Sequence, residues 1–162
     1  MKNLRDLFID ELKDAYDAEQ QIVDALPEMM DASKSQELKD AFNTHLEATK
    51  EQVARLEEVF KQLDLKAQRK SCSGMKGLIE EGEEIIKKKS NSDPTVIDAA
   101  LITAAQRVEH YEVAAYGTLR DYADQLGEKD VAKLLQQTLD EEKRTDKKLT
   151  DLAQKINAAA VR

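Results

Sequence analysis

Apolar residues recur at spacings of three and four along nearly the whole 162-residue chain. This is the period of an amphipathic α-helix, with one face buried and the other in water. The sequence contains only 5 Gly and 2 Pro, so few positions interrupt the pattern. We therefore predict an all-α fold, and the length suits a single domain over residues 1–162.

The first half of the chain divides into two long helices and one short helix. We expect the first helix to end near Met30. The pattern Ser33-x-x-Gln36 resembles a capping box and predicts the start of a second helix, which carries apolar residues as far as Leu63. After a polar segment that contains Cys72, a short helix is expected over about 75–88.

Two further long helices are predicted in the second half. Asp93 has the character of an N-cap and Pro94 suits the first helical position, where its missing N–H costs nothing. We expect this helix to run to about Gln125, with Gly127 as the residue that ends it. The last helix is predicted from about Lys129 to the C-terminus.

The lengths of the connections predict the topology. The first and second long helices are joined by a short turn, as are the third and fourth, so each pair should form an antiparallel hairpin. The middle connection is about 30 residues long and contains the short helix. Short, long, short is the connectivity of a ferritin-like four-helix bundle with one crossover.

Polar residues interrupt the apolar faces where core residues are expected. Each of the four long helices places at least one of them inward, and the second helix adds Thr49 and Gln52 to its inward face. Counting from the turns, Glu19 lies 14 residues before Ser33, and Glu112 and Glu142 lie 15 residues on either side of Gly127. These positions are all mid-bundle. The candidate metal ligands are Glu19, His45, Glu109, Glu112, Glu142 and Asp146.

Carboxylates that converge in an apolar interior cannot all stay ionised without compensation. Divalent cations can provide this compensating charge, and a set of carboxylate and imidazole ligands is suitable for iron, manganese or zinc. We therefore predict two metal ions per chain, most simply iron.

Each candidate also has a simpler interpretation. A glutamate at the edge of an apolar stripe can pack its stem and keep its carboxylate in water. His45 is either a ligand or a packed, hydrogen-bonded residue, and Asp146 could instead pair with a Lys or Arg at the rim. The hydroxyl of Tyr116 is either a donor to the site or simply satisfied in the core. Cys72, in its polar segment, is expected as a free surface thiol, with a disulfide between two chains as the alternative.

Charge and composition exclude several classes of function. The net charge of −8 and the 4% aromatic content disfavour nucleic-acid binding. The amphipathic N-terminal segment is neither a signal peptide nor a membrane span, and a single cysteine suits a reducing compartment. We expect a cytoplasmic protein that binds neither nucleic acid nor membrane.

Several segments resemble the YciF-like stress-response family of ferritin-like proteins. They include HLEATKEQVARLEEVF, AAQRVEHYEVAAYGTL and TLDEEKRTDKKLTDLA, and the likeness extends in order over essentially the whole chain. The resemblance implies a ferritin-like fold, a homodimer, a rubrerythrin-like di-metal centre and expression under stress.

The match to a rubrerythrin-like ligand pattern is incomplete. Glu19 and Glu109-x-x-Glu112 fit it, but Glu142-x-x-Thr145 stands where Glu-x-x-His is usual. In the second helix, Glu47-x-x-Lys50 resembles a Glu-x-x-His that has lost its histidine, yet a helical wheel turns Glu47 away from the core.

Three functions are consistent with these features. The first is an iron-dependent oxidoreductase that oxidises Fe(II) or consumes peroxide or oxygen. The alternative is a non-catalytic metal-binding or dimeric interaction protein with a degenerate site. A DNA-protecting mini-ferritin is disfavoured by the net charge of −8.

Overall fold

The computed structural model describes residues 1–161, which form five α-helices and one short 3₁₀ turn. The helices are α1 (Leu4–Ala32), α2 (Gln36–Gln62), α3 (Ser73–Lys87), α4 (Pro94–Gln125) and α5 (Lys129–Ala160), and the turn is η1 (Lys89–Asn91).

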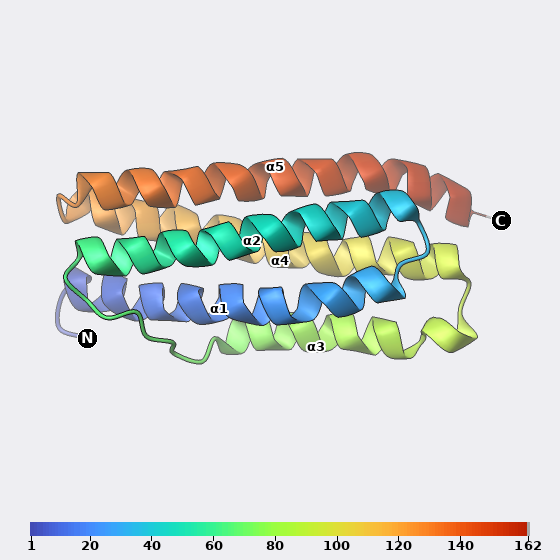
Figure 1. Cartoon of the computed structure of the whole chain (residues 1–162), viewed down its shortest axis with the longest axis horizontal. Helices are drawn as coiled ribbons and strands as arrows, with labels where there is room; N and C mark the ends of the chain where they lie inside the picture. Colours follow the sequence, from blue (N-terminus) through green and yellow to red (C-terminus); the bar gives the residue numbers. More distant parts are fainter. Residues whose placement is uncertain (162) are drawn as a thin grey trace.

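Four long helices lie side by side, with α3 on the outside (Figure 1). The pairs α1–α2 and α4–α5 are antiparallel hairpins with the most extensive contacts in the molecule, and α3 packs on α1 and α4. The segment from α2 to α4 returns along the length of the bundle and carries α3 (Figure 1). The predicted four-helix bundle with a crossover and a short fifth helix is confirmed.

Most of the predicted helix ends are confirmed. The carboxylate of Asp93 accepts a hydrogen bond from the Thr95 N–H at 2.7 Å, and Pro94 is the first residue of α4. Gly127 follows α4 with a φ of +79°, a left-handed conformation that glycine adopts without strain.

The predicted start of α2 was wrong by two residues. Ser33 belongs to the end of α1, because its N–H bonds to the carbonyls of Met29 and Met30 and its hydroxyl donates to Met29. Ser35 is the N-cap of α2, and its hydroxyl accepts from the Leu38 N–H. The α1 helix therefore extends to Ala32 and leaves a turn of only three residues.

Asp98 connects this turn to α4. Its side chain is buried, and its two oxygens accept hydrogen bonds from the N–H groups of Lys34 and Ser35, each at 2.8 Å. A carboxylate of one hairpin thus satisfies backbone donors at the turn of the other.

Cys72 is buried, with an exposed fraction of 0%, so the expectation of a surface thiol was wrong. The carboxylate of Asp17 accepts from the Cys72 N–H at 2.8 Å and from Arg69 at 2.7 Å, which holds the crossover against α1. The Cys72 sulfur caps α3 and lies 3.0 Å from the Tyr111 hydroxyl. Burial raises the pKa of the thiol.

The core consists of two apolar clusters. One takes its buried residues from 8–16, 56–63, 116–123 and 131–139, and the other from 18–42, 72–75, 97–105 and 149–156. Buried polar side chains lie between the two apolar clusters, near the middle of the helices. Among residues 1–161, no helix is both long enough and apolar enough to cross a membrane.

Candidate metal centre

Four side chains from three helices meet in the interior. One potential ligand atom from each of His45, Glu109, Glu112 and Glu142 lies within 4.8 Å of the corresponding atoms of the other three. All four residues are buried. We call these residues, together with Glu19, the carboxylate cluster.

Glu19 joins the four from α1. It is fully buried, and its charge contributes to raising the pKa of both Glu109 and Glu112. The cluster thus holds five of the six predicted ligands. Glu109 and Glu112 are three residues apart on α4, a spacing that places both on one helix face.

Most polar atoms of the cluster lack partners. Within the described part of the chain, no group outside the cluster forms a hydrogen bond with either oxygen of Glu109 or Glu112 or with either nitrogen of His45. One oxygen of Glu19 and one of Glu142 are also unpaired among these residues. Orphaned buried polar atoms cost about 1–3 kcal/mol each, and more when charged. The cluster therefore has the chemistry of a site that requires protons or cations.

The carboxyl groups do not titrate as ordinary side chains. Burial, followed by the charge of Glu142, raises the pKa of Glu19 to about 8. Burial raises the pKa of Glu142 to about 7, and burial with the charge of Glu142 raises the pKa of Glu109 and Glu112 well above the ordinary value. Without a cation, the cluster retains protons near neutral pH.

His45 is the imidazole of the cluster. Its Nε2 lies 3.2 Å from Oε1 of Glu109. Burial lowers the pKa of His45 to about 4, while burial raises the pKa of Glu109, so the two groups face each other neutral rather than as an ion pair. Neutral imidazole is the form that ligates metals.

A hydrogen-bond network holds Glu142 from α2. The side-chain amide of Gln52 donates to Glu142 and, at 3.2 Å, to Glu141. The guanidinium of Arg55 binds both oxygens of Glu141, at 2.8 and 2.9 Å, and donates to Thr138 at 2.7 Å. This bidentate pair fixes the amide that in turn orients Glu142.

Tyr116 supports Glu19 from α4. Its hydroxyl donates to Oε1 of Glu19, and the side chain is buried. Burial, with the charge of Glu19, raises the pKa of the phenol well above its ordinary value, so it remains a protonated donor. Of the two interpretations offered for Tyr116, the structure supports the donor to the site.

Asp146 lies outside the carboxylate cluster. It is half-buried at the rim, 3.3 Å from Nε2 of His110, and it accepts from the Gln106 amide at 3.2 Å. The partners at the rim are therefore a histidine and an amide rather than the Lys or Arg considered above.

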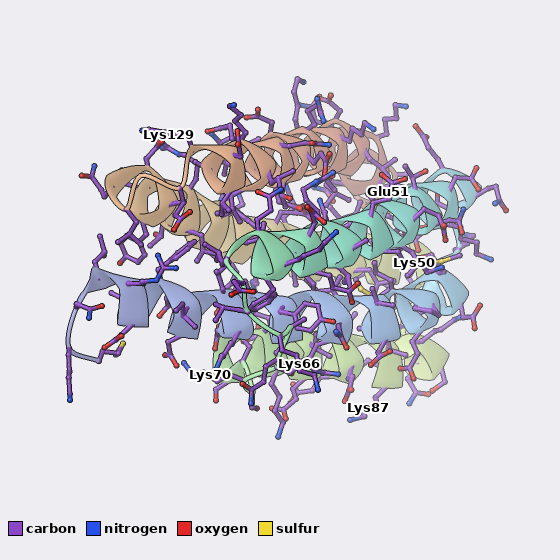
Figure 2. The ribbon with its side chains drawn as sticks, turned by 60° about the vertical axis from the view of Figure 1, so that its left-hand side comes forward. Lys50, Glu51, Lys66, Lys70, Lys87 and Lys129 are labelled. Atoms are coloured by element: carbon purple, nitrogen blue, oxygen red, sulfur yellow. The ribbon has the colours of Figure 1, made fainter. Side chains whose placement is uncertain are left out.

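Glu47 and Lys50 face away from the interior, as the helical wheel predicted. Both are exposed and pair with each other at 2.8 Å. Figure 2 labels Lys50 and Glu51 among the charged side chains that surround α2. The inward pattern of α2 is instead Gln52-x-x-Arg55. Gln52 was expected to face inward, but Arg55 was not, although its three-residue spacing from Gln52 could have indicated it.

The chain is similar to the members of one protein family. The family described as "Domain of unknown function (DUF892)" matches residues 3–162. Protein YciF of Escherichia coli strain K12 is 49% identical over 154 residues, which cover 94% of this chain and 92% of that protein.

Solved structures agree with this relationship. The crystal structure of the E. coli stress protein YciF matches with a TM-score of 0.92 at 48% identity and covers all of both chains. YcfI from Rhodopseudomonas palustris matches with a TM-score of 0.88 at 42% identity over 92% of this chain and 94% of that one. The resemblance noted from the sequence is thereby confirmed, and the chain belongs to the DUF892 family, as a relative of YciF.

Proposed function

We propose that this protein is a stress protein whose carboxylate cluster binds two divalent metal ions, most simply iron, and promotes the oxidation of Fe(II) by oxygen or peroxide. The observation that carries this proposal is the set of buried potential ligand atoms on Glu109, Glu112 and His45 that form no hydrogen bond outside the cluster. The relationship to the E. coli stress protein YciF supports the role in stress.

The number of ions follows from charge. Glu19, Glu109, Glu112 and Glu142 carry four negative charges when ionised, and two divalent cations neutralise four charges. Carboxylate oxygens with a single imidazole match the ligand preferences of iron and manganese, with zinc also compatible.

The residues of the chain have distinct tasks in this proposal. Glu109, Glu112, Glu142 and His45 hold the ions, and Glu19 completes the ligand set. Bound iron would supply a redox couple that the side chains themselves lack. The apolar clusters on either side exclude bulk water, which strengthens electrostatic interactions at the centre.

Gln52 and Tyr116 position ligands rather than bind metal. The Gln52 amide fixes one oxygen of Glu142 and leaves the other free to face an ion. The Tyr116 hydroxyl does the same for Glu19. Each hydrogen-bond donor therefore restricts the rotation of a carboxylate ligand and leaves one of its two oxygens available to a metal ion.

Oxidation of anaerobically loaded Fe(II) tests this function. Oxygen or peroxide is added, and the formation of Fe(III) is followed by its near-ultraviolet absorbance. We expect oxidation faster than in buffer and a strong loss of rate in Glu112→Gln. The matched control is Glu47→Gln, the same change at an exposed position on α2, which should retain the rate. Equal rates in all three proteins and in buffer would contradict the proposal.

A non-catalytic metal-binding protein is the second candidate. One reason is that the cluster has a single imidazole. The other is the Gln52-x-x-Arg55 pattern of α2, which places an amide and a cation where di-iron bundles have Glu-x-x-His. Tight metal binding that depends on Glu112, without accelerated oxidation, would identify this alternative.

A further inference from the structure

A small apolar cavity lies beside the carboxylate cluster. It has a volume of about 30 Å³ and reaches His45 between α1, α3 and α4. Its inner wall consists of Ile22, Leu26 and Ala105, all buried. Every lining residue except His45 is apolar.

The cavity shares its outer lining with a groove on the surface. Ala25, Met29, Ile79 and Val108 line both this cavity and a groove of about 410 Å³ beside α3. These four residues are half-buried, whereas the inner wall is buried. Helix α3 lies alongside α1 here (Figure 1), so the crossover helix forms part of the entrance. We call the cavity and these four residues the apolar passage.

His45 is also reached from the opposite side, by an approach of different character. A groove of about 420 Å³ between α2 and α5 is lined by His45 and by charged side chains that include Glu37, Asp40, Glu51 and Arg144. The imidazole of His45 therefore lies between a charged groove and an apolar cavity.

The lining of the passage determines which molecules it suits. A cavity of this volume exceeds the roughly 10–15 Å³ that one water-sized molecule needs. However, a buried water requires two to four polar partners, and only His45 is available. Hydrogen peroxide has the same requirement. An apolar diatomic gas has none, so it is the small oxidant that the passage accommodates without loss of hydrogen bonds.

We propose that the apolar passage admits dioxygen to the carboxylate cluster. The inference rests on the proposed function, because it names the oxidant that this site receives by this route. Peroxide does not depend on the passage.

Xenon binding to the metal-free protein tests the passage independently of iron. Xenon is an apolar probe of dry cavities, and its site can be read in crystals under xenon pressure. We expect a xenon atom beside His45 in the wild type and its loss in Ala25→Leu, which fills the mouth. Ala48→Leu is the matched control, since Ala48 is also half-buried but lines the charged groove. No xenon at this place, or unchanged occupancy in Ala25→Leu, would overturn the proposal.

Oxidation rates then test dioxygen itself. In the iron-loaded protein, Ala25→Leu should slow oxidation by dioxygen and leave oxidation by peroxide unchanged. Slowing of both, or of neither, would count against the passage. If the wild type does not oxidise Fe(II) at all, the proposed function fails while the xenon result still decides whether the passage exists.

Discussion

At the scale of single residues, the carboxylate cluster makes the stability of the metal-free protein depend on pH. The folded-state pKa is about 8 for Glu19 and about 7 for Glu142, both above the ordinary value of 4.5. The native state therefore binds more protons than the unfolded state, so stability decreases as pH rises through these values. His45 acts in the opposite direction, because its pKa is lowered to about 4, and its contribution is lost as pH falls below 6.5.

The carboxyl groups dominate the interval between pH 6.5 and 8, because His45 is neutral there in the native state and at least half neutral in the unfolded state. We predict that the free energy of unfolding of the metal-free protein falls across this interval. The fall should be on the order of 1.4 kcal/mol per pH unit for each proton retained. Urea unfolding at several pH values in the presence of a chelator measures it, and a flat profile would show that the cluster does not retain protons.

Replacement of one buried carboxyl group should affect stability and metal binding differently. In metal-free Glu112→Gln at pH 8, we expect a free energy of unfolding equal to or greater than that of the wild type, because an unpaired buried carboxyl has been replaced by a neutral amide. Added metal should stabilise this variant less than the wild type. Chemical unfolding with and without metal provides the comparison, with Glu47→Gln as the exposed control. Destabilisation of the metal-free variant by several kcal/mol would contradict this electrostatic account.

The candidate ligands were easier to predict from the sequence than the residues that hold them in place. Glu109 and Glu112 were predictable because they interrupt a regular apolar stripe on one helix. The Arg55–Glu141 pair was not, since it joins α2 to α5 and depends on how the two hairpins dock. The burial of Cys72 was missed because it depends on the hydrogen bond that its N–H donates to Asp17, 55 positions earlier in the chain.

At the scale of helices, Asp98 links the two hairpins, and its removal should be costly. Asp98→Ala leaves the N–H groups of Lys34 and Ser35 without their acceptor. We predict a loss of about 1–3 kcal/mol in the free energy of unfolding. Thermal or urea unfolding measures it. Asp140→Ala on the surface of α5 is the control and should change stability by about 0.5 kcal/mol or less.

Helix boundaries were predictable where one local signal dominated. Asp93 and Pro94 mark the start of α4 without competition from a neighbouring helix. The turn between α1 and α2 contains two serines, Ser33 and Ser35, and either could cap α2 on sequence grounds. Docking against Asp98 favours Ser35, a tertiary contact that local sequence does not reveal.

At the scale of the whole molecule, two apolar clusters enclose a layer of acidic side chains. The clusters supply the apolar packing of the bundle, and the layer between them contains the candidate metal site. The bundle and its crossover followed from periodicity and connection lengths alone, because four amphipathic helices have few ways to bury their apolar faces. We expect the acidic layer to reduce the stability of the metal-free protein, as a site kept for metal binding would.

Metal titration of the metal-free protein at pH 7, with simultaneous measurement of proton release, tests the central claim most directly. We predict about two divalent ions bound per chain, protons released as they bind because ligands must deprotonate, and both effects lost in Glu109→Gln but kept in Glu47→Gln. Two results would show that the buried carboxylate cluster is not a metal site. One is the absence of stoichiometric binding. The other is binding that releases no protons and is unchanged in Glu109→Gln.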